Sequence, residues 1–231
     1  MIQGLKQFAA IASLGLRIGA KDRERLVSPV MFAATILLLF AFAIGTSFEA
    51  ELMIRLYVAE TFLALFLALQ VSFARAFEPD TQDRVFDLLR TYPLSPLAWF
   101  FGKYVQVLIS GVLILLPAMA LGVFFHQQAG VSLTLGSLAI ALLALVGLSA
   151  LGTVLSLITM GSSARQIVYP ILYFPLTTPV LLAAVEATRA HLLDGKEITA
   201  LFSSWLGLLG IFDIMYLTLS VLVFGELIKP D

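Results

Sequence analysis

The chain has 231 residues, of which 60% are hydrophobic and only 13% are charged, and its mean hydropathy is +1.00. Soluble domains are about half apolar and about a quarter charged, so this composition excludes a water-soluble globular domain. The 14 basic and 15 acidic residues nearly balance, which argues against nucleic acid as a partner. Because the chain has no cysteine, it cannot form disulfides, thiolate metal sites or a cysteine nucleophile.

The first 26 residues mix apolar residues with scattered charges. They contain no uninterrupted apolar run followed by a small-residue cleavage site, so we expect no cleaved signal peptide. Apolar and small residues recur here at steps of three and four: Leu5, Phe8, Ala9, Ala12, Leu16 and Gly19. This spacing predicts an amphipathic helix over about residues 1–26 that lies on the cytoplasmic membrane surface.

Six apolar segments follow, over about residues 30–48, 52–73, 104–125, 133–157, 167–186 and 204–225. Each is near the roughly 20 residues that span a bilayer, where backbone groups must be hydrogen-bonded within their own segment. We therefore predict an all-α protein with six transmembrane helices, in a single membrane domain over residues 1–231. Only three of the 14 basic residues, Arg55, Arg189 and Lys196, fall on the side opposite the termini. Cytoplasmic loops retain positive charge, so both termini are predicted to be cytoplasmic.

The longest hydrophilic stretch connects the second and third spans, from Arg75 to Lys103. Within it, residues 79–92 predict a short helix, because Pro79 suits a first helical turn and Pro93 ends the helix. One face of this helix is apolar and carries Thr81, Val85, Leu88, Leu89 and Tyr92. The other face mixes acidic and basic residues, whereas membrane-surface helices usually carry lysine-rich faces. A helix in the headgroup layer is the alternative, but the mixed charges favour docking into a groove of a partner protein.

Two runs of this sequence resemble a known family. The run Phe86-Asp87-Leu88-Leu89-Arg90-Thr91-Tyr92-Pro93-Leu94-Ser95-Pro96 resembles the turn between the second and third helices of type 2 ABC exporter permeases. Within that superfamily, Arg75-x-Phe77 followed by Asp80-x-x-Asp83, together with the proline-rich run Tyr173 to Leu182, is similar to the haem exporter protein B (CcmB) family of cytochrome c maturation. The resemblance extends over essentially the whole chain.

The resemblance implies a permease of the bacterial inner membrane, bathed by membrane lipid, that works as a homodimer or in a larger complex. Its partners would be a CcmA-like ATPase subunit and CcmC-like and CcmE-like proteins. ATP would bind to the ATPase, haem would be the cargo or leave on a chaperone, and the chain would hold no cofactor of its own and be no enzyme. The helix over 79–92 would meet the ATPase through Asp80, Arg84, Val85, Asp87, Leu88, Leu89 and Tyr92.

The sequence itself agrees that nucleotide is handled elsewhere. Its one Gly-Lys pair, Gly102-Lys103, is followed by Tyr104 and has Leu97 where a phosphate-binding loop needs its first glycine.

Two ionisable residues, Glu60 and Asp213, fall within predicted spans, where a charge is costly enough to indicate a function. At about 1.5 Å per residue they lie roughly 12 and 14 Å from the external ends of their helices, so we expect them in one layer. A role in assembly and a role in conformational coupling both stay open.

His126 and His191 fall at external helix ends and are candidate haem ligands, although histidines at helix ends more often lie at the wet interface. We predict no metal site.

The fifth span contains three prolines, Pro170, Pro175 and Pro179, which are expected to kink or break it. The distorted helix would be either a functional hinge or an ordinary structural kink. The fourth span carries a stripe of small residues, which predicts close helix packing: Ser149, Gly152, Thr153 and Ser156.

Three other functions remain as alternatives. The first is a general type 2 exporter permease for a lipid, glycan or drug, and the second is a membrane scaffold without transport. The third is a membrane enzyme that uses Glu60, Asp213 and a histidine for acid and base chemistry. We disfavour the enzyme because the histidines should lie roughly 12 Å or more from the carboxylate layer.

Overall fold

The computed structural model describes residues 2–21, 23–44, 49–81, 94–127, 130–160, 162 and 164–228. Within these ranges the chain is helical and contains no strand, as predicted. The helices are α1 (Ile2–Lys21), α2 (Arg23–Ile44), α3 (Ala50–Ala74), α4 (Glu78–Thr81), α6 (Pro96–Phe125), α7 (Leu135–Thr159), α8 (Arg165–Leu192), α9 (Ile198–Leu201) and α10 (Trp205–Leu227).

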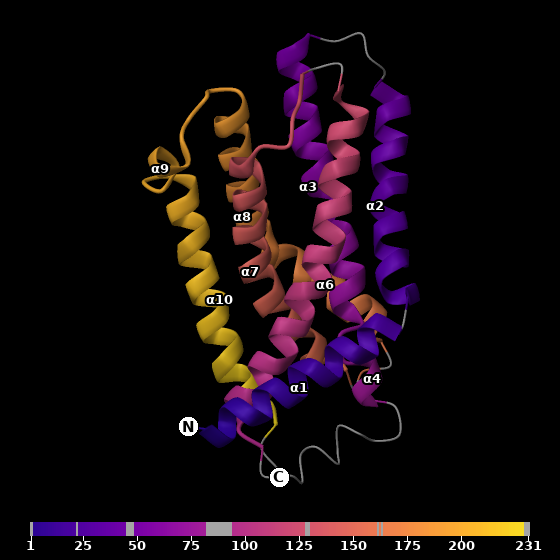
Figure 1. The fold of residues 1–231 in the computed structure, drawn as a ribbon, viewed down its shortest axis with the longest axis vertical. Helices are drawn as coiled ribbons and strands as arrows, with labels where there is room; N and C mark the ends of the chain where they lie inside the picture. Colours follow the sequence, from indigo (N-terminus) through magenta and orange to yellow (C-terminus); the bar gives the residue numbers. More distant parts are fainter. Residues whose placement is uncertain are drawn as a thin grey trace.

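Six helices, α2, α3, α6, α7, α8 and α10, are long and apolar enough to cross a membrane. They form one bundle in which α1 and the C-terminal end of α10 lie at the same end (Figure 1), called here the terminal end. The opposite end is called the far end. This agrees with the predicted even number of crossings, and the assignment of the terminal end to the cytoplasm stays a prediction.

The third span begins earlier than predicted, at Pro96 rather than near residue 104. Proline suits the first turn of a helix, and Trp99 and Phe100 are fully buried, so packing extends the helix beyond the apolar run. The fifth span also extends further, to Leu192.

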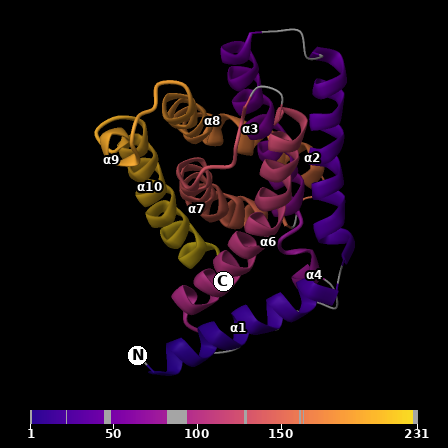
Figure 2. The ribbon, with the colours of Figure 1, turned by 45° about the horizontal axis from the view of Figure 1, so that its top comes forward.

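The centre of the bundle is α7, the most buried of the six spans (Figure 2). Its small residues face neighbouring helices, as predicted. A Cβ atom on Gly152 would lie 2.5 Å from Cδ2 of Phe73 on α3. Ser220 on α10 donates a hydrogen bond to the carbonyl oxygen of Ala150 at 3.0 Å, and Ser156 donates to that of Ala74 at 3.4 Å. Small side chains thus allow α3 and α10 to approach α7 closely.

The outer spans present large apolar side chains to their surroundings. Phe42 on α2, Ile171 on α8 and Ile211 on α10 are all exposed. Such surfaces are the expected lipid-facing sides of a membrane bundle.

Three prolines lie inside α8, and yet α8 is one uninterrupted helix, so of the predicted kink or break the break does not occur. Hydroxyl groups supply additional hydrogen bonds along the same stretch. Thr177 donates to the carbonyl of Tyr173 at 2.6 Å, and Thr178 donates to that of Phe174 at 2.7 Å. The Tyr216 hydroxyl on α10 donates to the Leu176 carbonyl. Side-chain hydroxyls and neighbouring helices of this kind let membrane helices tolerate proline, and a hinge in α8 stays a prediction.

The N-terminal helix forms as predicted, but it packs on protein rather than only on the membrane surface. It crosses α6 near the terminal end (Figures 1 and 2). A Cβ on Gly102 of α6 would lie 2.6 Å from Cγ2 of Ile11, and Gln7 accepts a hydrogen bond from the backbone nitrogen of Ser95 at 3.1 Å. Leu5, which the sequence assigns to the apolar face, is 69% exposed. The helix therefore turns one side to α6 and leaves another side free for lipid.

We predict that Gly102→Leu loosens α1 from α6. The added side chain would meet Ile11, whose Cβ lies 2.9 Å from the ideal Cβ position, and such overpacking costs roughly 1–3 kcal/mol. The measurement is maleimide labelling of a single cysteine placed at the buried Ala12, which is clean because the chain has no cysteine. Labelling should be faster in Gly102→Leu and unchanged in the control Gly4→Leu, where a Cβ meets nothing within 4 Å. Equal labelling in all three proteins would contradict the packing.

Candidate functional site

Most of the residues predicted to meet an ATPase lie outside the described residues: Arg84, Val85, Asp87, Leu88, Leu89 and Tyr92. Their role stays a prediction. The described part includes the first turn of the predicted helix, α4, which begins at Glu78. The Thr81 hydroxyl donates back to the Glu78 carbonyl at 2.7 Å, which closes this turn.

Asp80, the remaining residue of that set, points into the protein. Its carboxylate pairs with the ammonium group of Lys103 on α6, and the two residues are only 8% and 5% exposed. The Lys103 Nζ also lies 5.1 Å from the centroid of the Phe77 ring, in cation–π geometry. Asp80 therefore holds the connection to α6 in this structure, instead of presenting its charge at a docking surface as predicted.

Aromatic side chains surround this ion pair at the terminal end. Phe224 on α10 is in ring contact with Phe77, Trp99 and Phe100, with centroids 6.4, 5.9 and 5.5 Å apart. Phe77, Trp99, Phe100 and Phe224 are all fully buried. The cluster joins the connection after α3 to α6 and α10, so the predicted docking helix starts from a tightly packed base.

A second buried polar pair lies toward the far end. Nε2 of His126, the residue that follows α6, is 3.4 Å from Oε2 of Glu60 on α3, and both residues are 3% exposed. The His126 Nδ1 lies 3.0 Å from the Gly122 carbonyl oxygen, which can only accept, so Nδ1 carries a hydrogen. The two groups are within ion-pair distance, but neither carboxylate oxygen of Glu60 has a hydrogen-bond partner among the described residues.

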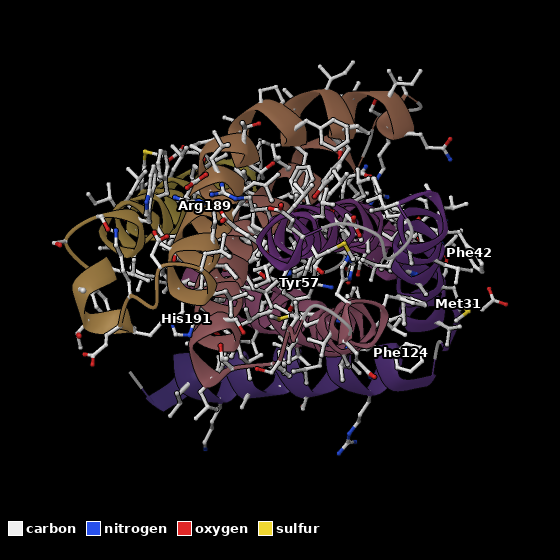
Figure 3. All side chains as sticks on the ribbon, turned by 90° about the horizontal axis from the view of Figure 1, so that it is seen from above. Met31, Phe42, Tyr57, Phe124, Arg189 and His191 are labelled. Carbon is white, nitrogen blue, oxygen red and sulfur yellow. The ribbon has the colours of Figure 1, made fainter. Side chains whose placement is uncertain are left out.

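This contact corrects the predicted distance of roughly 12 Å or more between histidine and carboxylate layer. The predicted depth of each residue was counted from the end of its own helix, on the assumption that all helices end at the same height along the bundle. They are not, because α3 extends beyond α6 at the far end (Figure 1), which brings Glu60 level with the end of α6. Seen from that end (Figure 3), Tyr57 lies within the bundle while Met31, Phe42 and Phe124 lie at its rim. Tyr57 contacts the His126 ring edge-on, with centroids 5.7 Å apart.

Asp213 on α10 lies in a different layer. It packs against Gly147 in the middle of α7, next to Val146, whose carbonyl oxygen is 3.4 Å from the Tyr104 hydroxyl. Tyr104 lies on α6, and His126 directly follows this helix 22 residues later, a rise of about 33 Å. The expectation that Glu60 and Asp213 share one layer is therefore wrong.

Gly147 is predicted to be required for the packing of α7 on α10. A Cβ there would lie 2.2 Å from Oδ1 and 3.3 Å from Cα of Asp213, so Gly147→Ala should destabilise the protein, by roughly 1–3 kcal/mol if it behaves as typical overpacking. Thermal unfolding in detergent measures the effect. The control is Gly210→Ala on α10, where nothing lies within 4 Å and where replacing glycine by alanine should stabilise the helix slightly. Similar shifts in both variants would argue against the close contact.

The two histidines have separate partners. His191 lies at the end of α8, where Nδ1 is 2.9 Å from the Lys196 carbonyl oxygen and Nε2 is 3.1 Å from the Thr134 hydroxyl, next to the start of α7. His126 is bound to Gly122 and Glu60 instead. The arrangement does not bring the two imidazoles to one shared haem or metal site, and the described residues contain no group of three potential metal ligands. Nor does it assemble Glu60, Asp213 and a histidine into one acid–base centre.

Comparison with known proteins identifies the family of the chain. The family model of the CcmB protein matches residues 6–229. The chain belongs to the CcmB protein family. It is also similar to the heme exporter protein B of Rhodobacter capsulatus, with 28% identity over 187 residues that cover 78% of this chain and 81% of the relative. With its six spans, this CcmB chain is a multi-pass protein of the bacterial inner membrane.

Two contacts of this CcmB chain escaped the sequence analysis. Lys103 was named as the end of the connection and as part of a failed phosphate-binding pattern, and His126 as a candidate haem ligand, but neither was paired with its carboxylate. The sequence offered two signals for the Asp80–Lys103 pair: a lone lysine near the end of a span, and an acidic residue in the preceding connection. Their spacing of 23 positions follows no helical period, so only the folded chain identifies the partner.

Proposed function

We propose that the chain is the permease subunit of an ABC transporter complex for cytochrome c maturation. A separate ATPase subunit hydrolyses ATP, and the permease couples this hydrolysis to haem export or to the release of a haem-loaded chaperone. The match to the CcmB family over residues 6–229 is the observation that carries this proposal. The similar protein from Rhodobacter capsulatus is named as a heme exporter, which supports haem as the cargo in this proposal.

The arrangement at the terminal end supports an ATPase as the partner. The connection from Arg75 to Ser95 starts from the buried cluster of Phe77, Asp80 and Lys103 and leads into α6. Force applied to residues 82–92 would therefore act on α6 and on the adjoining end of α10. The sequence has no phosphate-binding loop of its own, which fits hydrolysis in a separate subunit.

The complex would also include CcmC-like and CcmE-like proteins, with this chain as a homodimer or as part of a larger assembly. Haem would be a cargo and not a resident cofactor. Because His126 and His191 already have protein partners, either could ligate haem iron only after giving up a contact seen here.

Affinity purification from membranes in mild detergent tests the proposal. The tagged chain is purified, its partners are identified by mass spectrometry, and the sample is scanned for haem absorption; membranes with an untagged chain are the control. Recovery of an ATPase together with CcmC-like and CcmE-like proteins is expected. An ATPase recovered without them would favour a general exporter of a lipid, glycan or drug, and no ATPase at all would favour a membrane scaffold.

A further inference from the structure

We infer that Asp80 and Lys103 form a buried joint that passes movement of the coupling segment, residues 82–92, into α6. Lys103 is then a positioning residue for coupling, although it lies inside the protein. The inference rests on the proposed function, because it requires an ATPase that moves this segment.

Burial makes this ion pair a firm connection. The side chains of Asp80 and Lys103 are almost fully shielded from solvent, and the Lys103 ammonium group is held additionally over the Phe77 ring. Separating two charges in such a place leaves each without compensation, which is far more costly than breaking a pair in water. Asp80 and Lys103 should therefore move together when the connection is displaced.

The position of the ion pair in the chain links the two ends of the connection that contains the coupling segment. Asp80 lies two positions before the coupling segment, and Lys103 is the eighth residue of α6, eleven positions after the segment ends. The ion pair therefore closes a loop whose base lies in the aromatic cluster around Phe224. Displacement of Asp80 would therefore pull on the Lys103 side chain as well as on the backbone that leads into α6.

The helix that receives the movement extends through the whole bundle. α6 has 30 residues, about 45 Å of helix, and contacts α1, α2, α3, α7 and α10. Just past its other end lies the His126–Glu60 pair. Movement of Lys103 therefore has a direct route from the terminal end to the buried contact between α6 and α3.

The alternative is that Asp80 belongs to the docking surface, as the sequence analysis predicted. The two roles differ in what is lost. A docking residue contributes to ATPase binding, so its removal weakens the complex. A joint contributes to coupling, so its removal leaves the ATPase bound and reduces only the response of the complex.

The test uses the full complex with the double variant Asp80→Asn/Lys103→Met. This variant removes both charges together, so it leaves no unpaired buried charge and is expected to fold. Asp80→Asn and Lys103→Met alone, and the exchanged pair Asp80→Lys/Lys103→Asp, complete the set. Three quantities are measured: thermal unfolding in detergent, the amount of co-purified ATPase, and permease-dependent stimulation of ATP hydrolysis.

The double variant is expected to unfold near the wild-type temperature and to retain the ATPase, but to lose stimulation by about tenfold, a factor that corresponds to about 1.4 kcal/mol of activation free energy. The exchanged pair is expected to recover part of the stimulation. Wild-type stimulation in a folded double variant would overturn the joint, and loss of ATPase binding would assign Asp80 to the docking surface instead. If the wild-type chain recruits no ATPase, the proposed function itself fails, and that result is read from the wild type alone.

Discussion

Replacing His126 by leucine is expected to lower the free energy of unfolding by about 1–3 kcal/mol, the usual cost of leaving a buried polar group without its partner. The variant leaves the Glu60 carboxyl group inside the bundle without the imidazole that lies 3.4 Å from it, and it removes the hydrogen bond to the Gly122 carbonyl. It also removes the ring contact with Tyr57. Unfolding of the purified chain in mixed micelles, with increasing denaturing detergent, measures the change.

The double variant Glu60→Leu/His126→Leu is the decisive control. Replacing both members of a buried pair with apolar residues is often nearly neutral, so the double variant should be more stable than His126→Leu alone. His191→Leu offers a comparison at a less buried histidine, where two hydrogen bonds are lost at about 1 kcal/mol each. If the effects of Glu60→Leu and His126→Leu simply add, the two side chains do not interact in the protein.

Introducing a carboxylate at Leu88 or Leu89 is expected to abolish ATPase recruitment without unfolding the bundle. Both leucines belong to the predicted apolar face of the coupling segment and lie outside the described residues. A charge placed on a face that is buried against a partner must lose its hydration without gaining a partner, which costs more than about 2 kcal/mol. We expect at least about tenfold less co-purified ATPase with Leu88→Asp or Leu89→Asp than with the wild-type chain.

The control is Asp83→Asn, which changes charge by one unit on the other face of the same predicted helix. It should retain the ATPase. Normal ATPase binding by both leucine variants would contradict the placement of the interface. Loss of the ATPase in all three variants would instead indicate that the segment is sensitive to any change, and thermal unfolding in detergent would separate that case from a specific contact.

The two buried pairs lie at opposite ends of α6, one at the terminal end of the bundle and one toward the far end. Asp80 and Lys103 fix the start of α6 to the connection after α3, and Glu60 and His126 fix its other end to α3 itself. α6 is thus held by a buried polar pair at each end. Such contacts have discrete bonded and broken states, which suits helices that must change between defined arrangements.

The sequence by itself determined the features that depend on short stretches of chain. Six apolar runs are long enough to cross a bilayer, and an isolated segment in lipid must hydrogen-bond its own backbone, so the six helices and the common end of the termini follow without knowledge of packing. The three-and-four spacing in the first 26 residues likewise predicted α1. The family likeness also depended on local runs, such as Tyr173 to Leu182.

Only the tertiary structure decided which side chains meet. Glu60 reaches His126 because α3 extends past the end of α6, and no local pattern encodes this axial offset. Asp80 turns inward because Lys103, 23 positions later, lies on the neighbouring helix. Asp213 packs on Gly147 because a residue without a Cβ lets two helices approach at that level. The offset and rotation of one helix against another result from packing summed over whole helix faces, whereas helix formation in lipid is determined within each segment.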